Sequence, residues 1–136
     1  MVLPHLNLIC LVYSLVYSIA STRNSIYFQA PPSSPEKFHY SERTKTSLSL
    51  TWRPPRNDGG SPISGYIIEK KRQDEPEFVP VNKELCTDLF MTVPELAEMF
   101  VYEFRAKAVN SMGTSDPSIT MTVVIQDDEG IYYLIQ

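Results

Sequence analysis

Few residues of this sequence are of the types that carry out catalysis. A cysteine or serine nucleophile needs a nearby base, and the two histidines of the chain are His5 and His39. His5 lies in an apolar N-terminal segment, whereas His39 alternates with charged neighbours, as a surface residue does. Cys86 is the one cysteine after residue 30, and the default for such a residue is a small buried or edge side chain. We therefore predict that the protein is not an enzyme.

The sequence also lacks the patterns that bind metals, phosphates or nucleic acids. No spacing of His, Cys, Asp and Glu resembles a ligand set, and the acidic run 127–129 is predicted to be a solvated linker. The Gly59-Gly60 pair is not followed by the Lys and Ser or Thr of a phosphate-binding loop. Sixteen acidic against twelve basic residues give a net charge of -4, which argues against binding a phosphate backbone. We expect no cofactor, no metal and no nucleic-acid partner.

The first thirty residues differ in composition from the rest of the chain. Residues 6–20 form an apolar run without charge, and a secretory signal peptide ending at Ala20 is one interpretation. Intron read-through is another, because residues 27–29 can be encoded by a pyrimidine-rich tract ending in AG, and residues 130–132 by a splice-donor-like sequence. A genuine tail is the third. A spanning helix needs about 20 apolar residues, so a membrane partner is not expected.

Residues 31–129 are predicted to form one domain, between an N-terminal flank of residues 1–30 and a short tail of residues 130–136. Eleven prolines against five glycines, with short runs of β-branched and aromatic residues between turn formers, indicate strands rather than long helices. Residues 31–35 are proline-rich and predict an extended linker. The expected strands are one around His39 and those at residues 47–52, 63–72, 78–81, 89–93, 100–110 and 119–125.

Alternation along these runs predicts the two faces of each strand. Trp52 should lie in the core with the leucines at positions 48 and 50. In the run 100–110, Phe100 falls on the same face as Tyr102 and Phe104. Phe90 falls opposite the face shared by residues 89, 91 and 93, so an exposed Phe90 would require an explanation. The run 78–81 is interrupted by a proline, which confines it to a sheet edge.

Turn formers surround these strands in a characteristic order. They are Pro54, Pro55, Asp58, Gly59, Gly60, Pro62, Gly65, Asn110 and Gly113. Together with Trp52, Tyr66, Leu96, Tyr102 and Phe104, they resemble a fibronectin type III domain, most of all the versions in titin, twitchin and myosin-binding protein C. The resemblance covers residues 31 to about 126. It implies an all-β, seven-stranded antiparallel β-sandwich of the immunoglobulin-like kind.

The spacing of Leu96 and Tyr102 resembles the tyrosine corner of such sandwiches. In that motif the phenol hydroxyl bonds to upstream backbone and stabilises the crossing between the sheets. The sequence departs from the family at Met99, where relatives carry glycine or asparagine. A side chain in a left-handed turn at Met99 would cost about 1 kcal/mol.

The resemblance implies a structural function. It points to a non-catalytic module of a titin-like scaffold in the cytoplasmic sarcomere, which acts as a rigid load-bearing spacer and a protein-binding surface in a tandem array. The implied partners are neighbouring immunoglobulin or fibronectin type III domains and thick-filament proteins such as myosin. The alternative is an extracellular module of a secreted or cell-surface adhesion or receptor protein, with residues 1–20 as the signal peptide. The sequence identifies no binding residue under either hypothesis.

Overall fold

The computed structural model describes residues 28–128. Residues 1–27 and 129–136 lie outside the described residues, and with them most of the predicted flank and the whole predicted tail. The described residues contain strands and no helix, and therefore no helix that could span a membrane. The strands are β1 (Glu36–Arg43), β2 (Leu48–Arg53), β3 (Gly65–Arg72), β4 (Val79–Pro80), β5 (Phe90–Val93), β6 (Val101–Asn110), β7 (Gly113–Thr114) and β8 (Met121–Val124).

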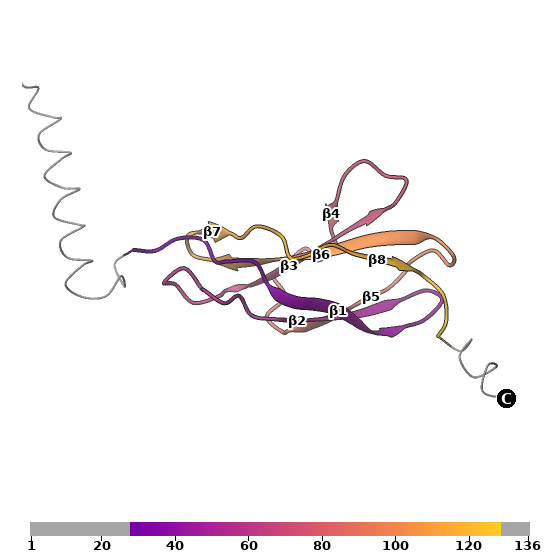
Figure 1. Ribbon diagram of the computed structural model, residues 1–136, viewed down its shortest axis with the longest axis horizontal. Helices are drawn as coiled ribbons and strands as arrows, with labels where there is room; N and C mark the ends of the chain where they lie inside the picture. Colours follow the sequence, from indigo (N-terminus) through magenta and orange to yellow (C-terminus); the bar gives the residue numbers. More distant parts are fainter. Residues whose placement is uncertain (1–27, 129–136) are drawn as a thin grey trace, which may run out of the picture.

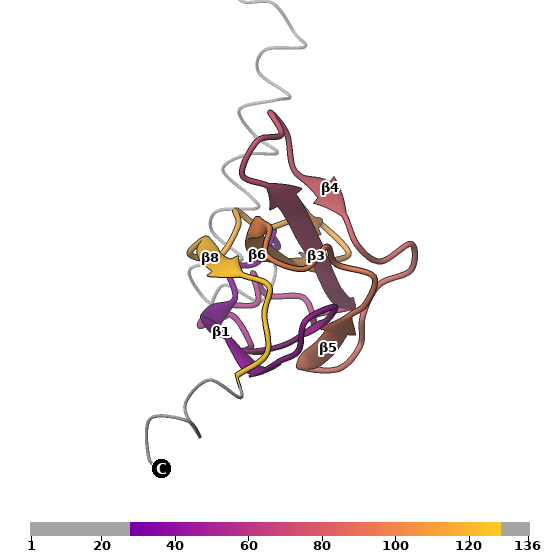
Figure 2. The same ribbon diagram turned by 90° about the vertical axis from the view of Figure 1, so that its right-hand side faces the viewer.

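The strands form two antiparallel sheets packed face to face (Figures 1 and 2). One sheet has the order β1-β2-β5, and the other has the order β4-β3-β6-β7, with β8 also paired to β6. The two ends of the described part of the chain lie at opposite ends of the long axis (Figure 1). The predicted all-β antiparallel sandwich is therefore confirmed.

The core lies between the sheets and is formed by the faces that alternation predicts. Trp52 is 3% exposed, and its ring packs between those of Phe38 and Tyr66 at centroid distances of 6.3 and 5.5 Å. The buried hydrophobic residues are Leu48, Leu50, Trp52, Tyr66, Ile68, Val93, Leu96, Tyr102, Phe104, Ala106, Ala108, Val123 and Ile125. Strand β6 shows the cleanest pattern, with every second residue buried along its whole length.

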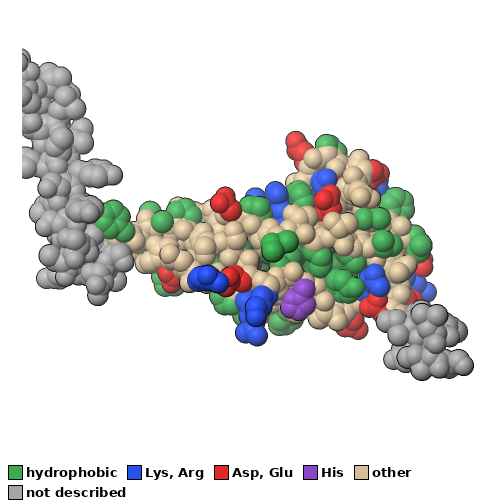
Figure 3. All heavy atoms as spheres, in the orientation of Figure 1, with side chains coloured by type: hydrophobic (Ala, Val, Ile, Leu, Met, Phe, Trp, Pro, Cys, Tyr) green, Lys and Arg blue, Asp and Glu red, His purple; other side chains and the backbone are tan. Residues whose placement is uncertain are grey.

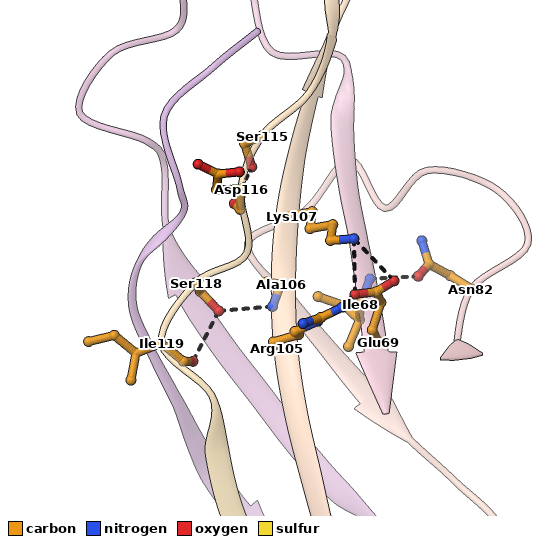
Figure 4. Close-up of polar contacts among 10 residues, drawn as sticks. All are labelled: Ile68, Glu69, Asn82, Arg105, Ala106, Lys107, Ser115, Asp116, Ser118 and Ile119. Carbon is orange, nitrogen blue, oxygen red and sulfur yellow. Dashed lines mark hydrogen bonds and ion pairs between the residues drawn. The ribbon is translucent and has the colours of Figure 1, made fainter. Parts of the chain in front are cut away.

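The strand count differs from the predicted seven because the two-residue strand β7 forms before the last predicted strand, residues 119–125, which corresponds to β8. Between them the hydroxyl oxygens of Ser115 and Ser118, rather than backbone carbonyls, accept the N–H groups of Ala108 and Ala106, at 2.8 and 2.9 Å. Figure 4 draws the bond from Ala106 to Ser118. Side chains thus replace part of the β-ladder there. As a result, the strand predicted for residues 119–125 begins at Met121.

One expectation about the faces changes in the structure, and two are retained. Phe100 is exposed rather than in the core, because β6 begins at Val101 and the preceding turn breaks the alternation. Its ring lies 4.9 Å from the Arg72 guanidinium. The predicted edge strand at residues 78–81 is confirmed as β4, which pairs only with β3 among the described strands. Phe90 is exposed on the outer face of its sheet.

Candidate functional site

The N-terminal chain is fixed to the loop that follows β2. The backbone N–H of Ala30 donates to Gly59 O at 2.8 Å, and that of Ser33 donates to Asn57 O at 2.8 Å. The Ser33 hydroxyl also accepts the Asn57 N–H at 3.0 Å. We call residues 28–33, loop residues 57–60 and Asn110 the N-terminal linker contact. The boundary expected at residues 30 and 31 passes through it, and the linker is packed rather than free, since Pro32 and Pro35 are buried.

Asn110 joins three segments within this contact. Its side-chain Nδ2 donates to Ala30 O and to Asp58 O, both at 2.7 Å. Its Oδ1 accepts the N–H groups of Met112 and Gly113 at 2.8 and 3.1 Å. The side chain is therefore satisfied on both ends, and the residue is 4% exposed. One amide thus connects the incoming chain, the loop after β2 and the turn after β6.

The double glycine allows the incoming chain to approach closely. Gly59 and Gly60 have φ values of 78° and 85°, which side-chain-bearing residues rarely adopt. A Cβ on Gly59 would lie 2.0 Å from Ala30 O, and one on Gly60 would lie 2.8 Å from Phe28 O. Asp58 contributes an Asx turn, because its Oδ1 accepts the Gly60 N–H at 2.8 Å. The double glycine is consequently part of a packing contact rather than of a ligand-binding loop.

The other turn residues of the predicted set lie around this contact or at the start of β3. Gly113 faces Pro31, whose Cγ would lie 3.3 Å from an added Cβ. Gly65 opens β3 and is buried against the chain before β5, where an added Cβ would lie 2.7 Å from Leu85 Cβ. Pro54, Pro55 and Pro62 belong to the loop between β2 and β3, outside both strands. Only some of the predicted turn residues therefore contact the N-terminal chain that precedes β1.

The outgoing chain is fixed at the other end of the sandwich. The Arg43 guanidinium donates to Asp128 Oδ1 through Nε at 2.8 Å and also through Nη2, and its Nη1 donates to Val124 O at 3.2 Å. The Lys45 N–H donates to Asp127 Oδ1 at 3.0 Å. We call these residues the C-terminal linker contact. Asp127 and Asp128 are exposed, as expected for a solvated linker, but the carboxylate of Asp128 accepts from the end of β1 and that of Asp127 from the turn after it.

The tyrosine-corner residues lie in the segment between β5 and β6. The Tyr102 hydroxyl accepts the backbone N–H of Ala97 at 3.0 Å. Leu96 is buried, and its own N–H donates to Thr46 O at 2.8 Å. The segment 94–100 is thereby connected to both sheets.

We expect Tyr102→Phe to destabilise the fold by about 1 to 3 kcal/mol, because the buried Ala97 N–H would lose its acceptor while the ring packing is kept. The measurement is equilibrium denaturation followed by circular dichroism. The matched control is Tyr66→Phe, since the structure records no hydrogen bond from the Tyr66 hydroxyl to another described residue. If Tyr66→Phe were costly and Tyr102→Phe neutral, the assigned register of β3 and β6 would be contradicted.

Met99 adopts the left-handed backbone conformation, with a φ of 69°. Two backbone hydrogen bonds stabilise the turn at Met99. The Met99 N–H donates to Ile125 O at 2.7 Å, and the Ile125 N–H donates to Phe100 O at 3.0 Å. The Met99 side chain itself is 64% exposed and contributes little burial in return. The position therefore carries the strain that a glycine would relieve.

Met99→Gly should stabilise the fold by up to about 1 kcal/mol, because glycine has no Cβ to disfavour the left-handed conformation. The observable is the denaturation midpoint, with an unchanged denaturant slope. Met112→Gly serves as the control: this exposed methionine does not have a positive φ, and glycine there should destabilise. A loss of stability in Met99→Gly would show that the side chain contributes more packing than its exposure indicates.

The candidate chemical groups do not form a reactive site. His39 is exposed, with Nδ1 at 2.7 Å from Lys37 O and Nε2 at 2.9 Å from the Thr51 hydroxyl. The Cys86 thiol donates to backbone oxygens of Asp88 and Phe90. Burial, and to a smaller extent Cys86, raises the pKa of the Tyr66 phenol above its ordinary value. Within residues 28–128, no group of three His, Cys, Asp or Glu side chains could hold a metal ion.

Residues 33–124 match the family model described as "Fibronectin type III domain". This protein belongs to the fibronectin type III family. Mouse fast-type myosin-binding protein C is 34% identical over 88 residues, which cover 65% of this chain and 8% of the mouse protein. The titin homolog of Caenorhabditis elegans is 37% identical over 93 residues, which cover 68% of this chain and less than 1% of that protein.

A solved structure gives the same result for the fibronectin type III fold. Domains A168–A170 from titin superpose on this chain with a TM-score of 0.66 at 31% sequence identity. The match covers 71% of this chain and 33% of the titin fragment. The fibronectin type III module described here therefore corresponds to a small part of each of these longer relatives.

Proposed function

We propose that this fibronectin type III module is a non-catalytic structural unit of a titin-like scaffold protein in the cytoplasmic sarcomere. It serves there as a rigid, load-bearing spacer between immunoglobulin or fibronectin type III neighbours. The similarity to titin and myosin-binding protein C modules supports this assignment, as does the small share of those proteins that the chain spans. The name of one relative, myosin-binding protein C, also motivates a thick-filament protein such as myosin as a partner.

The observation that carries the proposal is the fixation of both linkers. The incoming chain is hydrogen-bonded through Ala30 and Ser33, and the outgoing chain through Asp127 and Asp128. These contacts lie at opposite ends of the long axis (Figure 1). A module joined to its neighbours in this way holds a defined distance and direction between them. A ligand carrier would have no need of such fixation at both ends.

Strand pairing near the ends supports a load-bearing role. Strand β1 is paired with β2 from Glu36 to Arg43, and β8 is paired with β6 from Met121 to Val124. Tension applied through the two linkers would act on the linker contacts and on these antiparallel pairs. Survival under force depends on the unfolding rate rather than on equilibrium stability. Asn110 and Arg43 would therefore be among the first side chains to bear the load.

The test is where the protein lies in the tissue that expresses it. An antibody raised against residues 28–128 should label muscle fibres in a striated pattern. Recovery of the protein from culture medium, with its N-terminus cleaved after Ala20, would instead establish the extracellular alternative. Backbone NMR relaxation of the purified chain tests the rigid linkers separately: the amides of Ala30, Ser33 and residues 125–128 should tumble with the sandwich. Linker amides with order parameters below about 0.6 would contradict the spacer mechanism.

A further inference from the structure

Phe90 is a large apolar side chain that the sandwich leaves uncovered. It is 61% exposed at the start of β5, an edge strand of the β1-β2-β5 sheet. Phe90 pairs with Thr51, which pairs in turn with His39, so the three residues form a row across the outer face of that sheet. The core does not require an aromatic residue there, and exposed aromatic residues are enriched where protein surfaces meet.

Cations lie beside this row. Arg53 is exposed two residues after Thr51 on the same face of β2, since the intervening Trp52 is buried. Lys37 is exposed at the irregularity in β1, and the Arg56 side chain is 86% exposed and 3.6 Å from Glu36. Among the described residues, neither Lys37 nor Arg53 forms an ion pair. We call Lys37, His39, Arg53, Arg56 and Phe90 the β1–β2–β5 patch.

The space-filling view shows the same arrangement. Figure 3 shows Lys and Arg side chains, with an acidic side chain among them, next to the histidine on the side of the molecule formed by β1 and β2. The chain as a whole has a net charge of -4, so this local concentration of cations runs against the overall charge. Such a contrast directs an acidic partner to one face.

The outer face of the other sheet differs because its charges are already satisfied. Lys71 pairs with Glu103 at 2.7 Å. Arg105 and Lys107 both pair with Glu69, at 2.7 and 3.3 Å (Figure 4). All five side chains are a quarter exposed or less.

The aromatic residue of that second face is covered as well. The Arg105 guanidinium lies 4.0 Å from the centre of the Phe78 ring, and the Lys71 ammonium group lies 5.7 Å from it. An acidic partner would have to compete with internal carboxylates on the β3–β6 face, whereas the β1–β2–β5 patch offers cations and an open ring.

We propose that the β1–β2–β5 patch binds an acidic protein surface that carries an exposed apolar side chain. The apolar side chain packs on Phe90, and carboxylates beside it pair with Arg53, Lys37 and Arg56, which lie toward the Glu36–Arg53 end of the sheet. A nucleic acid also combines charge with stacking, but Glu36 and Glu42 on the same strand and the net charge disfavour a phosphate backbone. This inference goes beyond the proposed function, which names no binding residue and no chemistry of a bound surface.

The first test is a titration of the isotope-labelled full chain followed by NMR. The probes are two helical peptides of about 21 residues with the same leucine pattern, one with glutamates and one with lysines at the flanking positions. The glutamate peptide should shift amide signals of β1, β2 and β5. Its affinity should fall several-fold between about 50 and 300 mM salt, because the contact is partly electrostatic. Equal binding of the lysine peptide, or shifts centred on β3 and β6, would overturn the proposal.

Substitutions identify the residues responsible. Arg53→Glu and Phe90→Ser should each weaken the glutamate peptide by about tenfold or more, equivalent to about 1.4 kcal/mol. Lys83→Glu is the matched control, an exposed lysine beside the β3–β6 face, and should change the affinity by less than about twofold. Thermal unfolding verifies that each variant is folded. An equal loss in Lys83→Glu, or an oligonucleotide that binds as tightly as the glutamate peptide, would refute the assignment.

Discussion

Trp52→Ala should remove about 3 to 5 kcal/mol from the free energy of unfolding. The indole is 3% exposed between Phe38 and Tyr66, so its removal opens a cavity that neither neighbouring ring can fill. A loss of this size is a large fraction of the about 5 to 15 kcal/mol by which domains are stable. Equilibrium denaturation followed by far-UV circular dichroism is suitable, because the substitution removes the only tryptophan fluorophore.

Two further substitutions test whether the loss of stability in Trp52→Ala comes from the cavity. The Trp52 Nε1 is buried without a hydrogen-bond partner among the described residues, so Trp52→Phe loses no hydrogen bond and should cost clearly less than Trp52→Ala. Ile119→Ala, at an almost fully exposed side chain, should lie within about 0.5 kcal/mol of the parent. A Trp52→Ala loss no larger than that of Ile119→Ala would mean that Trp52 does not lie in the core.

Asn110→Ala should cost about 2 to 4 kcal/mol, the second largest effect expected. The substitution removes four hydrogen bonds and leaves Ala30 O, Asp58 O and two N–H groups of the turn after β6 without their partner. Each unsatisfied buried group costs about 1 to 3 kcal/mol, reduced where water can enter. Denaturant unfolding measures the loss, and NMR relaxation should show increased motion at residues 28–33.

A double-mutant cycle assigns part of this loss to the linker. Truncation of residues 1–30 removes Ala30, so Asn110→Ala should cost less in the truncated chain than in the full chain. Truncation alone should also destabilise the fold, because the Ala30 N–H donates to Gly59 O. Equal costs of Asn110→Ala in both chains would show that Asn110 acts only within the turn, and that the incoming chain is not fixed by it.

Local sequence was sufficient to predict the strands and their faces. Alternation along residues 47–52 and 100–110 requires only the two-residue period of a strand, and both runs bury the predicted faces except at Phe100. The prolines and glycines after Trp52 predicted a loop because they cannot continue a ladder. The left-handed turn at Met99 followed from the family resemblance, and its φ value agrees.

Prediction failed where a residue's environment depends on where its strand begins. Phe100 continues the alternation of β6, yet it lies in the turn before the strand and contacts Arg72 instead of the core. The last strand was expected to begin at residue 119, but it begins at Met121, and the hydroxyls of Ser115 and Ser118 accept ladder N–H groups in the segment before it. Serine forms such bonds only when a neighbouring strand presents N–H groups at the correct spacing, which the sequence pattern does not encode.

The sequence by itself determined the all-β class, the core faces and the turn positions, because these depend on residues a few positions apart. Tertiary structure alone decided the linker contacts and the β1–β2–β5 patch. Asn110 bonds to Ala30 across 80 positions, and Arg43 bonds to Asp128 across 85. Phe90, Arg53 and His39 likewise meet only through the pairing of β1, β2 and β5. Contacts of this range exist only after both sheets have formed, because the packing of the sandwich brings the separate loops and edges together.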